Sequence, residues 1–300
     1  MPASPDPKWP PATSLVGPGG AGRTTVGLVG VPTYATSVTP KSARSTPAAL
    51  REALARYSTW ATSDGRDLAE LVNVVDAGDV HDPDGEGGLQ RTRALCATLP
   101  ACDLTVVLGG DNAATWLALG ALAGERIGEF GLVTLDAHLD FREGRSNGSP
   151  VRQLVEAGLV GARVCQVGLA DFSNSAPYAA DARAAGVHAM ARARFDDERP
   201  EDLAREALAL AGAHGGPVYV DIDLDVADRA AVPGCPGSAP GGLSAAEVRR
   251  FVREVAASPQ VVALDVTEID VDREAPDGRT VRLGALVVLE AIAAVTRRAA

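Results

Sequence analysis

The segment Gly131-Leu132-Val133-Thr134-Leu135-Asp136-Ala137-His138-Leu139-Asp140 is an apolar run that ends in two aspartates and a histidine. The segment Val218-Tyr219-Val220-Asp221-Ile222-Asp223-Leu224-Asp225 has the same form and ends in alternating aspartates. Near-continuous apolar runs of this length are typical of strands that are covered on both faces of a parallel sheet. In open parallel sheets, ligands bind at the carboxyl ends of the strands. We therefore predict two strands of a parallel sheet, with a binding site at their acidic ends.

Apolar segments of strand length alternate with segments of helix length from Thr25 to the end of the chain. This alternation predicts a parallel sheet whose strands are joined by crossover helices. The predicted strands are 26–31, 71–75, 104–108, 131–135, 164–169, 187–190, 218–222 and 261–266. The predicted helices include 47–57, 89–99, 112–123, 151–157, 200–213, 245–257 and 281–298. For the first helix we predict Thr46 as N-cap, followed by Pro47 at the first helical position.

Residues 1–23 are rich in proline and glycine and show no periodic apolar pattern. Segments of this kind do not bury enough apolar surface to become ordered. A chain of 300 residues that is 46% hydrophobic can form one large α/β domain or two small ones. Because the alternation is unbroken after the N-terminal segment, we predict a flexible leader over 1–23 and one domain over 24–300.

The net charge of -11, with 39 acidic and 28 basic residues, argues against a protein that binds nucleic acid. Such proteins need clustered lysine and arginine to contact phosphates. No apolar run approaches the roughly 20 residues that a membrane-spanning helix needs. The four cysteines show no CxxC spacing, so the sequence does not indicate a disulfide framework. We predict a cytoplasmic protein that binds neither nucleic acid nor membrane.

The two acidic segments have the composition of a metal site. At the end of an extended strand, residues two apart point to the same side, so Asp136, His138 and Asp140 can converge on one point. Asp223 and Asp225 can converge in the same way. Four carboxylates and one imidazole offer mainly hard oxygen ligands, which favour Mn²⁺ or Mg²⁺. The four negative charges would balance two divalent ions.

Polar residues also follow two other predicted strands. The turn Gly109-Gly110-Asp111-Asn112 follows the strand 104–108, and Asp265 and Glu268 close the strand 261–266. Because the carboxyl ends of parallel strands meet at one edge of a sheet, all these residues are expected on the same rim.

These motifs resemble those of the ureohydrolases, a family that includes arginase, agmatinase, guanidino-acid hydrolases and formimidoylglutamase. The resemblance extends over nearly the whole chain after the leader. The matching motifs are Gly109-Gly110-Asp111-Asn112 with the GGDH motif, Asp136 to Asp140 with DAHxD, Asp223-Leu224-Asp225 and Asp228 with the second ligand strand, Pro233-Gly234 and Pro240-Gly241-Gly242-Leu243 with the loop after it, and Glu268 with a late glutamate.

The resemblance implies a three-layer α/β/α catalytic domain with a mostly parallel, eight-stranded sheet, as in arginase. It also implies two Mn²⁺ ions per chain bridged by a hydroxide. By this resemblance Asp136 and Asp223 bridge both ions, Asp140 binds one of them, and His138 and Asp225 bind the other. Two cations that share a water lower its pKa enough to supply hydroxide near neutral pH.

The catalytic residues implied by the resemblance are Asp140, Glu268 and His138. Asp140 would accept a proton and pass it to the departing amine. Glu268 would pair with a cationic amidine or guanidinium, which suits a carboxylate. The family also implies a homo-oligomer, either a trimer or a hexamer.

The chain departs from the family pattern at two places. Asn112 stands where GGDH supplies a histidine ligand, so the expected ligand is an amide oxygen and one ion is expected to bind weakly. The segment 146–153 lacks the His-Gly-x-Pro of arginases and is similar to the Ser-Gly-Thr-Pro-Phe-Arg-Gln of formimidoylglutamases. Arg142 fits the Asp-x-Arg pattern of that branch and could hold a substrate carboxylate. The predicted substrate-binding residues are Arg142, Asn147, Ser149 and Glu268.

We therefore predict a manganese-dependent hydrolase of a C–N bond in a small linear amidine or guanidine. A formimidoylglutamase-like activity, which converts N-formimidoyl-glutamate to glutamate and formamide, is the leading hypothesis. The alternative substrates are guanidines such as agmatine, a guanidino acid, arginine or N-hydroxyarginine, with release of urea or hydroxyurea. A non-catalytic metal-binding homologue is the further alternative.

Overall fold

The computed structural model describes the 300-residue chain except for residues 1–5, 7, 18–21, 40–42 and 299–300. Its main feature is an eight-stranded sheet in the order β4-β1-β5-β10-β9-β6-β7-β8, in which every neighbouring pair is parallel. The strands are β1 (Thr24–Val31), β4 (Val72–Asp79), β5 (Leu104–Gly109), β6 (Gly131–Leu135), β7 (Val164–Leu169), β8 (His188–Ala191), β9 (Val218–Asp223) and β10 (Val261–Thr267). The predicted parallel sheet of eight strands is confirmed.

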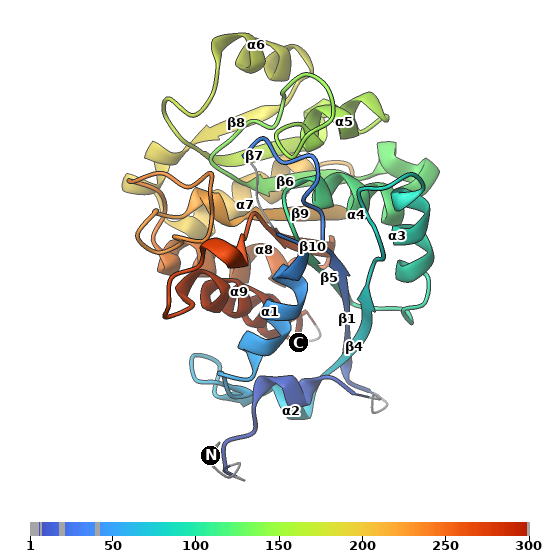
Figure 1. The fold of residues 1–300 in the computed structure, drawn as a ribbon, viewed down its shortest axis with the longest axis vertical. Coiled ribbons are helices and arrows are strands. Elements are labelled where there is room, and N and C mark those ends of the chain that lie inside the picture. The colour runs from blue at the N-terminus through green and yellow to red at the C-terminus, as the bar shows by residue number, and fades with distance from the viewer. Residues whose placement is uncertain (1–5, 7, 18–21, 40–42, 299–300) are drawn as a thin grey trace.

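Helices cover both faces of the sheet and give the protein three layers (Figure 1). The helices that pack on one face are α1 (Thr46–Leu54), α7 (Pro200–Ala211), α8 (Ala245–Ala257) and α9 (Arg279–Val295). Those on the other face are α3 (Gly88–Cys96), α4 (Ala113–Ala123), α5 (Pro150–Glu156) and α6 (Ala176–Ala184). The predicted three-layer α/β/α architecture is confirmed.

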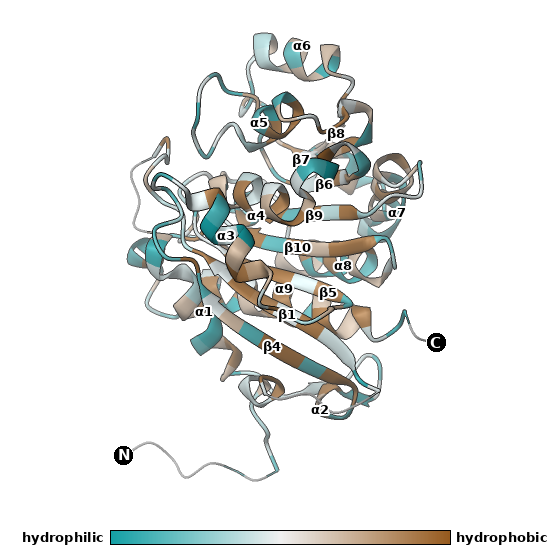
Figure 2. Cartoon of the chain, turned by 90° about the vertical axis from the view of Figure 1, so that its right-hand side faces the viewer, coloured by the Kyte–Doolittle hydropathy of each residue, from teal (hydrophilic) through white to brown (hydrophobic). Residues whose placement is uncertain are grey.

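The strands are apolar because they are buried on both faces. Along β9, Val218, Val220 and Ile222 contact the core on the face of α7 to α9, whereas Tyr219 contacts the core on the face of α4. All four side chains are fully buried. Brown bands along β10, β5, β1 and β4 in Figure 2 show the same apolar character. This two-sided burial explains the near-continuous apolar runs in the sequence.

The sequence-based prediction missed several short elements. These are β2 (Trp60–Ala61) and β3 (Arg66–Asp67), which pair as a hairpin, α2 (Leu68–Leu71) and α6. α6 buries only Ala182, so its sequence carries no apolar stripe that could reveal it. The predicted N-cap of the first helix was also wrong. Thr46 is the first residue of α1, and its hydroxyl donates to the carbonyl of Ile269 at 2.7 Å.

The predicted flexible leader needs a correction within residues 1–23. Ala12–Leu15 form a 3-10 helix, and Ala12 and Leu15 are buried in the main core. The Ala12 amide donates to Tyr57 O at 2.7 Å, and the Gly17 amide donates to Val74 O at 3.1 Å. These two apolar side chains and backbone hydrogen bonds anchor a segment whose composition alone indicates disorder. Residues 1–5, 7 and 18–21 of the predicted leader lie outside the described residues.

Among the described residues, no helix combines the length and the apolar character that a membrane span requires. The feature of the fold that matters for function is the edge formed by the strand ends. The neighbouring strands β5, β10, β9 and β6 in the middle of the sheet all end at this edge. Their C-terminal residues are therefore close in space, although the chain separates them widely.

Candidate metal centre

The predicted site residues come together at the carboxyl ends of four central strands. They are Asn112 after β5, Asp136, His138 and Asp140 after β6, Asp223 and Asp225 at the end of β9, and Glu268 after β10. All except His138 are buried. Such a concentration of buried carboxylates is costly unless the charges are compensated.

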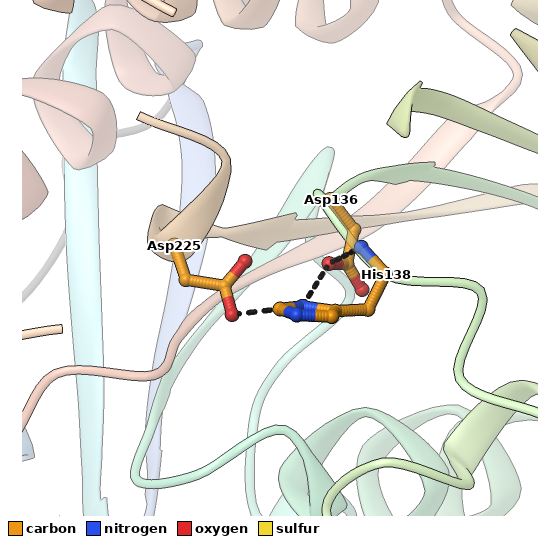
Figure 3. A group of neighbouring side chains, drawn as sticks. All are labelled: Asp136, His138 and Asp225. Carbon is orange, nitrogen blue, oxygen red and sulfur yellow. Dashed lines mark hydrogen bonds and ion pairs between the residues drawn. The ribbon is translucent and has the colours of Figure 1, made fainter. Parts of the chain in front are cut away.

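His138 lies between the carboxylates of Asp136 and Asp225 (Figure 3). Its Nδ1 atom is 3.0 Å from Asp225 Oδ2 and 3.5 Å from Asp136 Oδ1. One ligand atom from each of these three residues lies within 4.8 Å of the other two. Metal–ligand distances for such atoms are roughly 2.0–2.2 Å, so two ligands of one ion lie at most about 4.4 Å apart, and both distances from the His138 Nδ1 atom are within that range.

Each acidic segment curls at the strand end, and an aspartate holds the turn. The His138 amide donates to Asp136 Oδ1 at 2.7 Å, and the Asp225 amide donates to Asp223 Oδ1 at 2.8 Å. Asp225 itself lies in the 3-10 turn Leu224–Val226. The sequence argument assumed extended strand ends, and this geometry corrects it. Turns stabilised by aspartate side chains bring residues two apart to one place.

The excess of buried negative charge shifts the titration of the whole cluster. Burial raises the pKa of Asp136 to about 6 and raises the pKa values of Asp140 and Asp223 well above the usual range for aspartate. The carboxylate of Asp225 raises the pKa of His138 to about 12. The cluster therefore favours bound positive charge, which a divalent cation would supply in place of protons.

The residues present fit a hard divalent cation. Asp136 Oδ2 is buried, and no hydrogen-bond donor among the described residues contacts it. An orphaned carboxylate oxygen beside an imidazole and a second carboxylate is the arrangement expected of metal ligands. Because the donor set is oxygen-rich with a single nitrogen, it suits Mn²⁺ or Mg²⁺ better than metals that prefer thiolates.

Asn112 is oriented as a hydrogen-bond donor and not as a metal ligand. Its Nδ2 donates to Asp140 Oδ2 at 2.6 Å. Its Oδ1 faces the hydroxyls of Thr115 and Thr267, at 2.7 and 3.1 Å. The amide oxygen is the atom that could bind a metal ion, and it is turned toward the two threonines. This conformation does not support the predicted role of Asn112 as a ligand.

Asp140 and Glu268 both adopt left-handed backbone conformations, with φ of 52° and 67°. Such conformations are strained for residues with a side chain and persist where the surroundings enforce them. Glu268 Oε1 accepts hydrogen bonds from the Asn112 amide and from Asn147 Nδ2, both at 2.8 Å. Strain at the two acids predicted to be catalytic is typical of a functional site.

A cavity of about 430 Å³ opens over these residues. The predicted site residues in its walls are His138, Asp140, Arg142, Asn147, Asp223, Asp225 and Glu268. Asp136 and Asn112 are buried and do not line it. One region of the wall is acidic, and Arg142 adds a cation to the same cavity.

Two residues do not have the positions that the sequence suggested. Ser149 is fully buried away from the cavity, and its Oγ accepts from the Ser146 amide at 2.9 Å and from Gln153 Nε2 at 3.0 Å. It stabilises the start of α5 and does not contact substrate space. Asp265 is buried below the rim, where it accepts hydrogen bonds from Tyr219 and Thr115 at 2.8 and 2.9 Å.

The sequence reasoning missed the contribution of the connection between β7 and α6. Phe172, Ser173, Asn174, Ser175 and Tyr178 from this region line the cavity. The connection follows the carboxyl end of a predicted strand, and that position was the available signal. No motif marked it, because its residues are those of an ordinary polar loop.

A carboxylate-rich cluster that fits a divalent cation, at the carboxyl edge of a parallel three-layer sheet, is an arrangement that hydrolases use to activate water. Residues 24–294 match the sequence model of the arginase family, so the chain belongs to this family. The predicted family and enzyme class, an amidinohydrolase acting on C–N bonds, are confirmed.

Several relatives are similar over most of their length. A formimidoylglutamase from Halalkalibacterium halodurans is 32% identical over 254 residues, which cover 81% of this chain and 79% of that protein. Proclavaminate amidinohydrolase from Streptomyces clavuligerus is 33% identical over 240 residues, covering 76% and 74%.

Solved structures agree with this assignment. Formimidoylglutamase from Bacillus subtilis superposes with a TM-score of 0.88 at 26% identity, covering 98% of this chain and 94% of that one. Formiminoglutamase from Trypanosoma cruzi, crystallised with Mn²⁺, gives a TM-score of 0.86 at 22% identity, covering 97% and 99%. At this lower identity the second comparison concerns the fold.

Proposed function

We propose that the protein is a manganese-dependent hydrolase of N-formimidoyl-glutamate. Water adds to the amidine carbon, the bond from that carbon to the glutamate nitrogen breaks, and glutamate and formamide are released. The relatives named formimidoylglutamase support this substrate, and the formiminoglutamase crystallised with Mn²⁺ supports this metal.

The observation that carries the proposal is the charge distribution of the cavity. Asp140, Asp223, Asp225 and Glu268 line it together with Arg142. No acidic side chain among the described residues forms an ion pair with Arg142. Asp140, Asp223 and Asp225 are assigned to the metal ions, which leaves Glu268 and Arg142 to contact the substrate. A substrate with a cationic amidine and an anionic carboxylate is complementary to this pair, because its amidine would face Glu268 and its carboxylate would face the guanidinium.

The residues of the centre have separable roles in this reaction. Two Mn²⁺ ions held by Asp136, His138, Asp140, Asp223 and Asp225 would supply hydroxide from a shared water near neutral pH. Asp140 lines the cavity beside the centre and would carry a proton to the departing amine. Glu268, held in place by Asn147, would pair with the amidinium.

The proposal extends to the assembly and the setting of the enzyme. We propose a homo-oligomer, a trimer or a hexamer, that acts in the cytoplasm on a small molecule and binds neither nucleic acid nor membrane. The acidic composition supports the absence of nucleic-acid binding.

A guanidine is the second candidate substrate. The 33% identity with proclavaminate amidinohydrolase favours it, since that relative is an amidinohydrolase of another substrate. The two candidates differ at the reacting carbon, which carries hydrogen in a formimidoyl group and an amino group in a guanidine, and in the group attached to the nitrogen that leaves.

The test is a turnover screen on the manganese-loaded protein with N-formimidoyl-glutamate, agmatine, guanidinobutyrate, arginine and N-hydroxyarginine. Turnover of N-formimidoyl-glutamate alone is the expected result. Arg142→Ala should lower kcat/KM for it by roughly tenfold to a hundredfold, mainly through KM, since a charged hydrogen bond contributes about 1.5–3 kcal/mol.

Arg145→Ala is the matched control, because Arg145 stacks on Trp116, with its guanidinium carbon 4.8 Å from the ring centre, and does not line the cavity. It should leave KM unchanged. Turnover of a guanidine alone, or an Arg142→Ala variant with unchanged KM, would contradict the proposed substrate.

A further inference from the structure

Asn174 in the connection between β7 and α6 forms two hydrogen bonds to the segment that carries His138. Its Oδ1 accepts from the Leu139 amide at 2.8 Å, and its Nδ2 donates to the Ala137 carbonyl at 3.0 Å. The side chain belongs to a different strand end from the residues that it contacts. One planar amide thus bridges the backbone on both sides of His138.

This bridge has a defined geometric consequence. The Ala137 carbonyl belongs to the peptide group before the His138 Cα, and the Leu139 amide belongs to the peptide group after it. The φ and ψ angles of His138 set the orientation of these two peptide planes relative to each other. A group that holds both planes therefore fixes the direction of the Cα–Cβ bond of His138, and with it the starting point of the imidazole.

Packing alone does not hold this imidazole in place. The His138 side chain retains 30% of its exposure, whereas those of Asp136 and Asp225 retain 0% and 4%. Other bonds to the segment hold one peptide group each. The Ala170 amide donates to the Ala137 carbonyl at 3.0 Å, and Gln166 Nε2 donates to the Leu139 carbonyl at 2.7 Å, beyond the two planes that flank His138.

We infer that Asn174 is a positioning residue of the metal centre, which directs the His138 imidazole to the point that it shares with Asp136 and Asp225. This inference rests on the proposed function, because it assumes that His138 is a metal ligand. It adds a residue that no motif of the sequence marked.

The position needs an amide for a chemical reason. Only a side chain with a donor and an acceptor in one short planar group can contact both an N–H and a C=O at this spacing. Aspartate of the same shape lacks the donor, and its charge would oppose the Ala137 carbonyl. Leucine is similar in size but has neither a donor nor an acceptor. Loss of a hydrogen-bond partner that orients a metal ligand typically lowers metal affinity by about 10–100-fold.

The test compares Asn174→Asp and Asn174→Leu with the unaltered protein and with Asp171→Asn. Asp171 lies in the same connection with an exposed side chain, so it controls for changes in loop stability. Manganese binding is measured by titration, and the coupling of the two ions by electron paramagnetic resonance. Both Asn174 variants should lose about 10–100-fold in affinity for one ion and keep the other, so that the signal of the coupled pair is lost at limiting metal. Asp171→Asn should retain both ions.

A second measurement does not depend on metal or turnover. In a crystal structure of metal-free Asn174→Leu, the His138 imidazole should leave its position 3.0 Å from Asp225. An imidazole still in place, or both variants binding two ions with unaltered affinity, would overturn the inference. If the unaltered protein binds manganese but turns over no formimidoyl-glutamate, the proposed substrate fails and the titration still decides the role of Asn174.

Discussion

Asn112 is the residue at which this chain departs most clearly from the motif it resembles. Its hydrogen bonds show how the side chain is held at this position. The side-chain Nδ2 of Asn112 donates to Asp140, and its Oδ1 accepts from Thr115. An imidazole at this position would face the same carboxylate with a nitrogen lone pair that can bind a metal ion. The residue at this position thus decides whether the rim offers a nitrogen ligand beside Asp140.

We expect Asn112→His to tighten manganese binding by roughly tenfold or more, because the imidazole would add a nitrogen ligand where the Asn112 amide oxygen is turned toward Thr115 and Thr267. Manganese titration of the apoprotein measures the effect. Asn112→Ala is the control, since it removes the bond to Asp140 without adding a ligand, and it should not tighten either ion. Unchanged stoichiometry and affinity in Asn112→His would show that position 112 does not contact the metal.

At the residue scale, the spacing of the acidic residues and the histidine after two strands was enough to predict which side chains lie together. Asp136, His138 and Asp225 form a cluster because each follows a strand end within a short acidic segment. Ser149 and Asn174 were beyond this reasoning. The hydroxyl of Ser149 bonds locally to Ser146 and Gln153, which the family resemblance did not suggest. The amide of Asn174 reaches a segment about 35 residues away, and such a contact leaves no local pattern.

Among the elements, the turn between β5 and α4 shows how closely the strand ends approach one another. The Gly110 amide donates to Val31 O at 3.0 Å, and the Glu268 amide donates to Gly110 O at 2.9 Å. A Cβ atom at Gly110 would lie 2.0 Å from Thr33 O and 2.6 Å from Thr33 N. Since both contacts are with backbone, a side chain would have to displace the turn.

We expect Gly110→Ala to destabilise the protein by about 1–3 kcal/mol, as overpacking typically does, and to weaken manganese binding. The metal effect follows because the turn carries Asn112 and holds Glu268. Urea denaturation and manganese titration measure the two effects. Gly17→Ala is the control, because a Cβ there would meet no atom within 4 Å. Equal stability and metal affinity in both variants would contradict this account.

At the element scale, burial decided what could be predicted. The strands β1, β5, β6, β9 and β10 were recognisable because both of their faces are covered, which makes them largely apolar, whereas the edge strand β8 is partly exposed. α6 and the hairpin of β2 and β3 contact the core over few residues, so their composition resembles that of loops. The 3-10 helix Ala12–Leu15 was missed because only two of its side chains, those of Ala12 and Leu15, are buried in the core.

For the whole molecule, the buried acids make stability depend on pH and metal. Burial raises the pKa values of both Asp136 and Asp265 to about 6 in the folded protein, from a usual value near 3.8. Because the folded protein holds these protons more tightly than the unfolded chain, the protons stabilise the fold below pH 4. That stabilisation is lost as the pH rises through about 6.

The metal-free protein should therefore lose roughly 2–3 kcal/mol of unfolding free energy per group between pH 4 and pH 8. Urea denaturation in the presence of a chelator measures this loss. At pH 8, saturating Mn²⁺ should restore the part of this loss that comes from Asp136, because metal ions replace the proton there. It should not restore the part from Asp265, which hydrogen-bonds to Tyr219 and Thr115 below the rim. High salt is the control and should have little effect on buried charges. A metal-free protein that is equally stable at both pH values would contradict the prediction.

The order of strands also has a consequence for the synthesis of the chain on the ribosome. β10, near the C-terminus, separates two groups of strands, β4-β1-β5 and β9-β6-β7-β8, which have no hydrogen bonds to each other without it. A nascent chain that has not yet released β10 has unpaired edges at β5 and β9, and such edges are prone to association. Glu268 follows β10 directly. Pairing of the two groups of strands and the addition of Glu268 to the rim therefore occur in the same step, after the metal ligands that follow β6 and β9 have been synthesised.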